Sequence, residues 1–285
     1  GVNDALVWFD GTYRFDSLGW EQTRPVSVLN TNQQGKGYFS TNSTRENVNH
    51  GFPFARIARN CTMLQISGDA LTGTKLAVNC TIKKHHNVVP GAHADIYQNW
   101  GGSPEEPKKN RILFGVDASD VVGVQNFLFD GNGTSAYENF AIVDFAVENS
   151  GSESSQMCGP NTHIFLSNIS MPNQHINFRD SDVNNLMLAD DVVLQNVVAS
   201  KIFRGSWYSY GVPEGVYLRN SHIRAEHRIF ESDERVSNLS VGDLDFEWIE
   251  GSGWIYSGPG APMLVGTGVP IPGFLVDPVD KGFIP

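Results

Sequence analysis

A short alternation of polar and apolar residues that begins at an asparagine recurs along the chain. Clear copies begin at Asn60, Asn79, Asn126, Asn168, Asn196 and Asn220, and weaker ones at Asn149 and Asp243. The interval of 47 residues between Asn79 and Asn126 fits two periods. The spacing then averages roughly 23 residues, which is typical of proteins built from stacked repeats. The pattern therefore predicts one coil of a solenoid per repeat.

Each copy predicts a β-strand, because its residues alternate with period two and are rich in β-branched and aromatic types. A second strand follows in the best copies, at residues 175–179, 201–204 and 227–231. Two or three short strands per coil, with polar corners and no room for a helix, predict an all-β parallel β-helix. A β-sandwich with surface asparagines is the alternative. The regular register of the copies favours the β-helix.

A parallel β-helix also predicts where the asparagines lie. We expect the asparagines at positions 79, 126, 168, 196 and 220 to stack in one inward column, with their amides bonding from coil to coil. A solenoid grows along one axis, so the 285 residues are expected to form one domain. Residues 1–50 would form an N-terminal coil and irregular cap, residues 51–250 the coils, and the Pro/Gly-rich residues 251–285 a tail that packs on the solenoid.

Composition narrows the class of partner. Hydrophobic residues make up 40% of the chain and aromatic residues 11%, which excludes disorder, and no apolar run is long enough to span a membrane. The net charge of −11 argues against nucleic acid, since phosphate binding needs a basic surface. We therefore expect neither nucleic acid nor membrane as a partner. The oligomeric state is left open.

The start of the chain and its cysteines bear on location and cofactors. No signal peptide is visible and the chain begins at Gly1 rather than Met, so it is either a mature secreted form or a trimmed one; a secreted or extracellular location is expected. Cys61 and Cys80 occupy the same place in consecutive repeats and should lie side by side, either as buried thiols or as a disulfide. No spacing suggests zinc. No cofactor is expected; calcium is possible, but no ligand cluster supports it.

The least repetitive part of the chain, between Asn79 and Asn126, contains the first candidate site. If Ile96 points into the core, strict alternation turns His93, Asp95 and Tyr97 outward in one line, where they are candidate catalytic residues. An ordinary solvated face is an equally good interpretation. The residues expected to contact substrate beside them are Lys84, His86, Gln98 and Trp100.

The pattern His93-x-Asp95-x-x-Gln98, placed after the strand at residues 79–82, resembles secreted right-handed β-helix proteins of the pectate-lyase-like superfamily. The resemblance covers roughly residues 50–250. It implies a right-handed parallel β-helix first and carbohydrate chemistry second. It does not extend to one activity, since the Asn-Thr-Asp and Arg-Ile-Lys phrases of polygalacturonases are absent, and so is the calcium-binding aspartate cluster of pectate lyases.

A second group of candidate residues lies in the later repeats. Aligning their second strands on Phe178, Phe203 and Phe230 as inward residues creates two outward columns. The first column contains Arg179, Arg204 and Glu231, and the second contains His175, Ser200 and His227. The loop that follows Arg204 adds Trp207, Tyr208 and Tyr210.

These arginines and aromatics suit a sugar, because a ring stacks on its CH face and a guanidinium binds its carboxylate or sulfate. The loop aromatics could equally fold inward. Arg179 lies about four coils from His93, near 19 Å at the spacing of stacked strands. The two groups would then contact opposite ends of one extended polymer.

Together these residues predict an enzyme that cleaves an anionic polysaccharide. Elimination needs a base at C5 of a uronic acid and positive charge on its carboxylate, which His, Tyr, Lys or Arg can supply. Hydrolysis needs two carboxylates, for which Asp95 could pair with Asp144 or Glu138. The His, Tyr and Arg content favours a polysaccharide lyase over a glycoside hydrolase. A non-catalytic carbohydrate-binding, phage or surface protein is the third alternative.

Overall fold

The computed structural model describes residues 8–14, 39–48, 51, 55, 57–88, 93–100, 108–130, 137–149, 154–158, 161–179, 189–204, 216–223, 235–243, 245–249 and 253–257. Regular structure in these ranges consists of β-strands alone. The predicted all-β class is therefore confirmed. None of the described residues belongs to a helix of the length and hydrophobicity that crossing a membrane requires.

The described residues form sixteen strands. They are β1 (Trp8–Arg14), β2 (Phe39–Val48), β3 (Ile57–Arg59), β4 (Thr62–Ile66), β5 (Leu76–His86), β6 (Asp95–Trp100), β7 (Lys108–Val122), β8 (Gln125–Asp130), β9 (Tyr137–Asn149), β10 (Ser154–Cys158), β11 (Asn161–Arg179), β12 (Ala189–Arg204), β13 (Val216–Ile223), β14 (Val236–Val241), β15 (Asp245–Ile249) and β16 (Gly253–Ser257).

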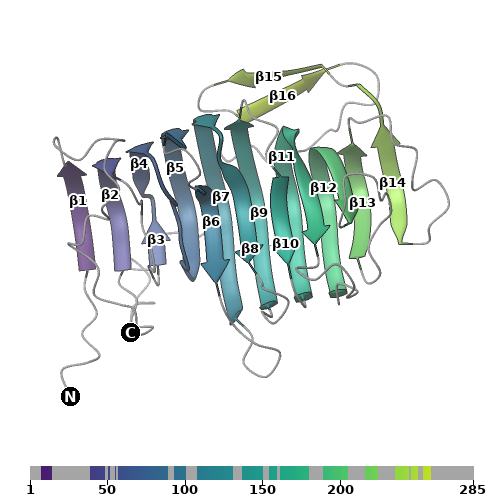
Figure 1. Ribbon diagram of the computed structural model, residues 1–285, viewed down its shortest axis with the longest axis horizontal. Coiled ribbons are helices and arrows are strands. Elements are labelled where there is room, and N and C mark those ends of the chain that lie inside the picture. The colour runs from purple at the N-terminus through teal and green to yellow at the C-terminus, as the bar shows by residue number, and fades with distance from the viewer. Residues whose placement is uncertain are drawn as a thin grey trace.

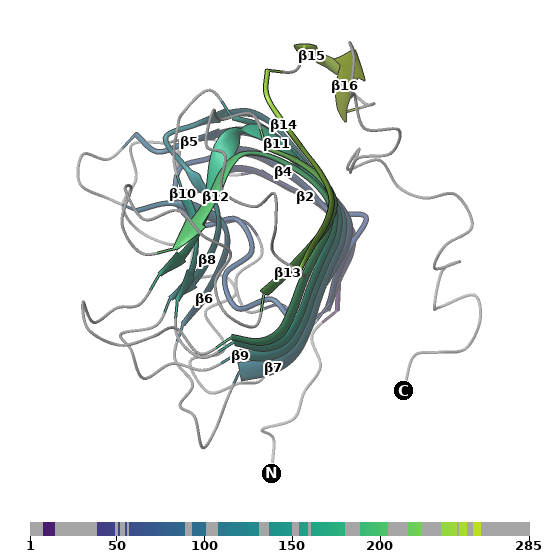
Figure 2. The same cartoon turned by 90° about the vertical axis from the view of Figure 1, so that its right-hand side faces the viewer.

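Fourteen strands join one large sheet in which the strand pairs are parallel, as Figure 1 shows. Its main path runs β1-β2-β3-β5-β7-β9-β11-β10-β8-β6, with β12, β13 and β14 continuing from β11 and with β4 between β2 and β5. We call each level of this stack a rung. Seen along the stack, the strands curve around a common interior, with β6, β8 and β10 across from β7 and β9 (Figure 2). This arrangement is consistent with a parallel β-helix.

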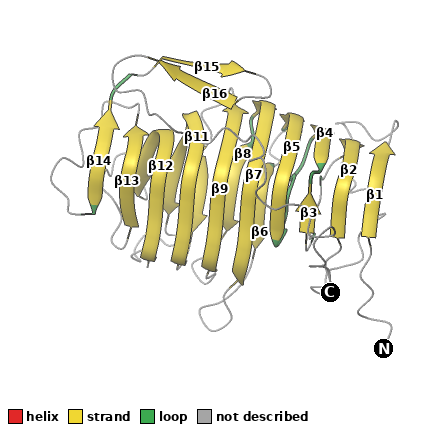
Figure 3. Ribbon diagram, turned by 180° about the vertical axis from the view of Figure 1, so that it is seen from behind, coloured by secondary structure: helices red, strands yellow, loops and turns green. Residues whose placement is uncertain are grey.

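The two remaining strands do not continue the stack. β15 and β16 pair antiparallel, and Figure 3 shows them lying across one end of the parallel strands. Trp254 attaches this hairpin to β9, because its indole Nε1 donates a hydrogen bond to the Val147 carbonyl at 2.9 Å. Among the described residues, the last strand of the parallel stack is β14, which ends at Val241. Most of the predicted cap and tail lies outside the described residues.

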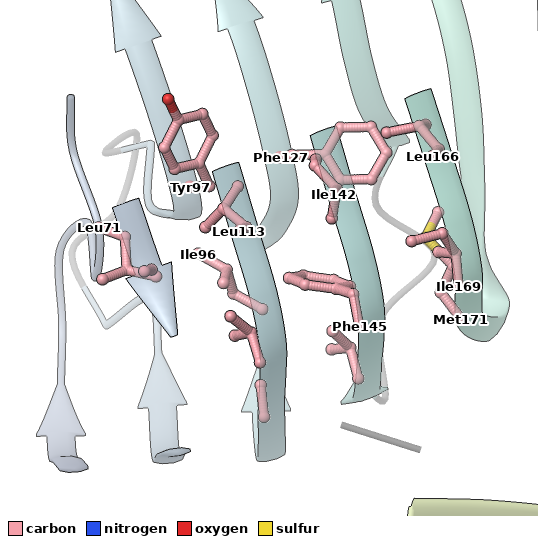
Figure 4. Packing of buried hydrophobic residues seen from close by; sticks show 14 of the residues in the cluster. Leu71, Ile96, Tyr97, Leu113, Phe127, Ile142, Phe145, Leu166, Ile169 and Met171 are labelled. Carbon is pink, nitrogen blue, oxygen red and sulfur yellow. The ribbon is translucent and has the colours of Figure 1, made fainter. Parts of the chain in front are cut away.

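The interior of the curved sheet is packed with apolar side chains. Phe127 and Phe145 meet edge to face with ring centroids 6.4 Å apart, and both are fully buried. Figure 4 shows Phe145 and Ile142 of β9 on the same interior surface as Leu166 of the neighbouring strand β11. Each rung thus contributes to one continuous core, which is how repeats that each contact only their neighbours bury a large apolar surface.

Single left-handed residues bend the long strands at regular intervals. In β7 the positive φ angles fall on Asn110 (58°), Gly115 (63°) and Asp120 (52°), five residues apart. The same spacing recurs in the neighbouring strands, where the left-handed pairs are Asn139 with Asp144 and His163 with Asn168. Asparagine, aspartate and glycine tolerate this conformation better than other residues. The polar corners of the sequence pattern are therefore the points where the chain turns.

The asparagine column exists, but its membership differs from the prediction. Backbone register places one member in each rung, namely Asn60, Asn79, Gly115, Asp144, Asn168, Asn196, Asn220 and Asn238. All eight are left-handed, with φ between 46° and 63°. The amide of Asn196 donates to Oδ1 of Asn168 at 3.0 Å, and Asn238 donates likewise to Asn220 at 3.0 Å. We call this set the asparagine column.

Two features of the predicted column are wrong. The side chains do not point inward, since Asn60, Asn220 and Asn238 are exposed. Asn126 is not a member, because Gly115 occupies the rung after Asn79 and Asp144 occupies the next. The interval of 47 residues between Asn79 and Asn126 is therefore not a whole number of coils. Glycine can adopt the left-handed conformation without a side chain, so no asparagine marks this rung.

Asn126 and Asn149 have a separate, interior position. Both are buried, and the Asn149 amide donates to the Val124 carbonyl at 2.8 Å and to Oδ1 of Asn126 at 3.5 Å. The Asn126 amide in turn lies 3.6 Å from the sulfur of Met171. Their similarity to the column is thus one of local sequence only, since their amides bond inside the fold.

The two neighbouring cysteines lie where the repeat predicts. Cys61 and Cys80 are in adjacent rungs, since the backbone N–H of Thr81 donates to the Cys61 carbonyl at 2.9 Å. Both thiols are free and buried. The hydrogen bond with Cys61, together with burial, raises the pKa of the Cys80 thiol well above its ordinary value. Between the two alternatives of the sequence, the structure has the pair of buried thiols.

Candidate functional site

The candidate site is built around a histidine and an aspartate at the start of β6. Nδ1 of His93 lies 2.9 Å from Oδ2 of Asp95. The imidazole is 49% exposed, whereas the carboxylate is fully buried. A carboxylate can only accept a hydrogen bond, so His93 donates through Nδ1, and any proton that the imidazole exchanges is carried by its second nitrogen, Nε2. The pair thus holds one tautomer of an accessible imidazole.

A turn in the preceding rung supports Asp95. The backbone N–H of Asp95 donates to Oδ1 of Asp69 at 3.2 Å, and the hydroxyl of Thr72 donates to Oδ2 of Asp69 at 3.0 Å. The backbone N–H of Ala70 completes the connection by donating to the Asp95 carbonyl at 2.9 Å. Asp69 is itself buried. These bonds fix the backbone from which both Asp95 and His93 project.

The predicted orientation of this stretch is correct for His93 and wrong for the two other candidate catalytic residues. Asp95 and Tyr97 are fully buried rather than outward. Alternation fails here because residues 94–99 are all at most 4% exposed, so side chains on both faces of β6 are covered. With both faces covered, alternation no longer separates core from solvent.

Tyr97 belongs to the core. Its ring meets Phe140 edge to face at 6.4 Å, and its hydroxyl donates to the Thr74 carbonyl at 3.4 Å. Burial raises the pKa of the Tyr97 phenol above its ordinary value, with Arg111 acting weakly in the opposite direction. A buried phenol held in its protonated form cannot reach a polymer outside the fold. We therefore remove Tyr97 from the catalytic candidates.

The basic residues at the end of β5 reach the surface. Lys84 is exposed at a left-handed corner with φ of 56°. Nε2 of His86 lies 2.8 Å from Oδ1 of Asp120, and this pair is more open to solvent than the His93–Asp95 pair, with 24% and 53% of the side chains exposed. Gln98 is buried, so it cannot contact a polymer as predicted. The side chain of Trp100 lies outside the described residues.

The carboxylates considered for hydrolysis do not flank Asp95. Asp144 is a member of the asparagine column in β9, and Glu138 lies near Lys109, with an Oε2–Nζ distance of 3.6 Å. Both are on β9, whereas Asp95 is the first residue of β6. The acidic neighbour that the structure brings to Asp95 is Asp69, and it is engaged by a backbone N–H and a hydroxyl.

The second group of candidates is not aligned as predicted. β11 and β12 pair His175 with Lys201 and Phe178 with Arg204, so the two strands are offset by one residue from an alignment on Phe178 and Phe203. Ile176 and Ile202 are the pair that faces the core, and they set the register. Arg179 and Arg204 therefore do not share a column.

The other members of this group are either buried or outside the described residues. His175 is buried, so its predicted outward position is wrong. Side chains of Arg179 and Arg204 are not among those the structure describes. The remaining candidates, Trp207, Tyr208, Tyr210 and His227, and the partner residue Glu231 lie outside the described residues.

Sequence reasoning missed the residues that support the site. Asp69 and Thr72 lie in a short turn that carries no repeat motif. The only signal in the sequence was that these two polar residues are three positions apart, which is the spacing of a local turn. Among the residues that the structure describes, no three His, Cys, Asp or Glu side chains are grouped to hold a metal ion. The geometry that the structure shows for acid–base chemistry is that of the His93–Asp95 pair.

No protein-family model matches the chain, and comparisons with curated proteins and with solved structures likewise give no match.

Proposed function

We propose that the chain is a right-handed parallel β-helix with coils of roughly 23 residues, of the kind found in the pectate-lyase-like superfamily, and that it is secreted. The parallel stack, its curvature and the left-handed corners support this architecture (Figure 2). On this fold we propose an enzyme that cleaves an acidic polysaccharide. The observation that carries the proposal is an exposed His93 bonded to a fully buried Asp95.

In the proposed elimination, His93 acts as the base. Nε2 takes the proton from C5 of a uronic acid, and the electron pair of that C–H bond forms a C4=C5 double bond. The C4–O bond breaks, and its electron pair leaves with the departing sugar oxygen, which then takes up a proton from solvent. Asp95 keeps Nδ1 protonated and stabilises the imidazolium that forms. Lys84 and His86 are our candidates for the positive charge that the substrate carboxylate requires. We assign no cofactor to the reaction.

A substrate screen tests this proposal. Purified protein is incubated with uronic and sulfated polysaccharides, and two products are measured: the ultraviolet absorbance of an unsaturated uronate and new reducing ends. A lyase gives both, whereas a glycoside hydrolase gives reducing ends alone. A carbohydrate-binding, phage or surface protein gives neither, and that result would refute the enzyme proposal.

Variants assign the reaction to the site. His93→Ala and Asp95→Asn should each lower turnover by about 100-fold or more, the usual effect of a positioned acid or base. His163→Asn is the matched control, because His163 is exposed elsewhere and asparagine tolerates its left-handed φ of 53°. Circular dichroism must show that the Asp95 variant is folded. Full activity in folded His93→Ala protein would contradict the assignment.

A further inference from the structure

An arginine takes the place of an apolar residue in the core of the stack. Arg111 of β7 pairs in register with Phe140, and the same interior position is Ile164 and Val192 in the next two rungs. These three apolar residues are at most 2% exposed. Ile112 is 45% exposed on the outer face, so alternation directs its neighbour Arg111 inward. Arg111 is itself only 8% exposed, and its guanidinium is therefore enclosed where the neighbouring rungs have hydrocarbon.

The protein offers little compensation for this buried charge. Nη1 of Arg111 donates a hydrogen bond to the Gly73 carbonyl at 2.6 Å. Nε is shielded from solvent and has no hydrogen-bond partner in the protein. The ion pairs between described residues do not include Arg111. Buried charges are normally paired, because the interior solvates charge poorly, so a negative group beside Arg111 would remove a large cost.

A second buried donor lies in the same corner of the core. Asn99 is 2% exposed, and its Nδ2 has no hydrogen-bond partner in the protein. Gly73 connects it to Arg111, because the Gly73 carbonyl accepts from Arg111 while its backbone N–H donates at 2.6 Å to the residue before Asn99. Tyr137 makes another connection, since its hydroxyl donates to the Asn99 carbonyl at 3.1 Å. Its ring meets that of Phe140, the strand neighbour of Arg111, at 5.9 Å.

The chemistry of this corner favours an anion. Three backbone carbonyls around it already accept side-chain hydrogen bonds, at Gly73, Thr74 and Asn99. The side-chain groups left over are both donors, namely Nε of Arg111 and Nδ2 of Asn99, and the first belongs to a positive charge. A buried water could accept from both donors, but only an anion also offsets the charge.

The packing around the two donors limits the size of a ligand. The ring of Phe140 meets that of Tyr97 at 6.4 Å as well as that of Tyr137, and all three residues are at most 2% exposed. Arg111 is close enough to Tyr97 to lower the pKa of its phenol against the larger effect of burial. Because interiors are packed to the density of organic crystals, a sugar acid is too large for this position.

We propose that Arg111 and Asn99 bind a small monovalent anion, of the size of chloride, inside the core. Nε of Arg111 and Nδ2 of Asn99 donate to the ion, and the guanidinium charge strengthens the first of these bonds. The unfolded chain does not hold the two donors together, so the ion binds the folded protein and stabilises it. This site is separate from the His93–Asp95 pair and does not depend on the proposed enzyme activity.

The dependence of stability on chloride tests this proposal. The 285-residue chain is unfolded in urea while sodium chloride is exchanged for sodium methanesulfonate, a larger anion, at constant ionic strength. Once chloride exceeds its Kd, each tenfold increase should lower the equilibrium constant of unfolding about tenfold. Bromide should act in the same way, and a bromide-soaked crystal should show an anomalous scattering peak beside Nε of Arg111.

Two substitutions at Arg111 assign the effect to the site. Arg111→Met removes the charge and the donors and should abolish the chloride dependence, and Arg111→Gln is a second neutral variant if methionine disturbs folding. Arg219→Gln is the matched control, because it removes the same charge from an exposed position, where the guanidinium lies 5.9 Å from the ring of Tyr217. The control should keep the full chloride dependence of the wild-type protein.

Two results would overturn the proposal. Wild-type protein that is equally stable in chloride and methanesulfonate would show that no chloride binds, and that water satisfies the buried donors. A chloride dependence that persists in either folded Arg111 variant would show that the ion binds at another position.

Discussion

The asparagine column offers a direct test of how the chain makes its corners. Asn196 is left-handed, with φ of 52°, and its amide donates to Oδ1 of Asn168 at 3.0 Å. Two substitutions separate these contributions. Asn196→Ala removes the hydrogen bond and places a residue in the left-handed region that tolerates it poorly. Asn196→Gly removes the same hydrogen bond but accepts the conformation.

The structure sets the expected magnitudes. A non-glycine residue without a helpful side chain loses about 1–2 kcal/mol in the left-handed conformation. A hydrogen bond within the protein that replaces a hydrogen bond to water contributes about 0.5–1.5 kcal/mol to the free energy of unfolding. Asn196→Ala should therefore lower the free energy of unfolding by about 1.5–3.5 kcal/mol. Asn196→Gly loses the hydrogen bond and some chain entropy, together about 1–2 kcal/mol, so the alanine variant should be less stable by about 1 kcal/mol.

Urea unfolding followed by tryptophan fluorescence measures the difference, and the six tryptophans of the chain supply the signal. Equal slopes of free energy against urea would show that the same structure unfolds in each variant. Gln195→Ala is the matched control, since Gln195 is the half-buried neighbour and is not left-handed. Its effect should stay within about 0.5 kcal/mol. If the alanine and glycine variants were equally stable, the left-handed corner would not be the cause.

Three further predictions concern a buried ring, two buried groups that titrate at alkaline pH, and two left-handed glycines. Phe145→Ala should lower the free energy of unfolding by about 3–5 kcal/mol, because it removes a fully buried ring that contacts Phe127; denaturant titration measures this, and a loss below 1 kcal/mol would contradict the packing. The raised pKa values of Cys80 and Tyr97 mean that the folded state holds these protons more tightly than the unfolded state. Stability should therefore be unaffected by these groups below about pH 9 and should fall as pH rises further, by up to about 1.4 kcal/mol per pH unit for each group. Tyr97→Phe should reduce that alkaline slope, and an unchanged slope would assign it to other groups. Gly115→Ala should destabilise through its φ of 63° and through a Cβ 2.8 Å from Oδ1 of Asn79, whereas Gly123→Ala, with φ of 65° but more space, should cost less in the same titration.

The strand repeat was predictable because it depends on local chemistry. Residues that tolerate the left-handed conformation are few, so their recurrence is visible in sequence wherever the chain uses asparagine. Gly115 and Asp144 form the same left-handed corner without an asparagine, so a pattern defined by asparagine does not include them. Asn126 has the right local pattern but bonds within the fold. The type of element was therefore readable, whereas the register between distant elements was not.

The candidate site shows the same division. The exposure of His93 could be inferred from the alternation of one strand. The burial of Asp95 could not, because it depends on the turn at Asp69, which lies 26 residues earlier and contacts Asp95 only through the stacking of rungs. Alternation predicts which side chains are buried only where one face of a strand meets water, and neither face of β6 does.

The left-handed corners explain why alternation fails more generally in this chain. In β7, Leu113 and Val116 both point into the core although they are three residues apart, because Gly115 reverses the alternation between them. A pattern with strict period two would place one of them outside. Each corner therefore shifts the inward positions by one, and the shift recurs every five residues. The inward positions of this chain are therefore predicted correctly only when the corners are located first and alternation is applied between them.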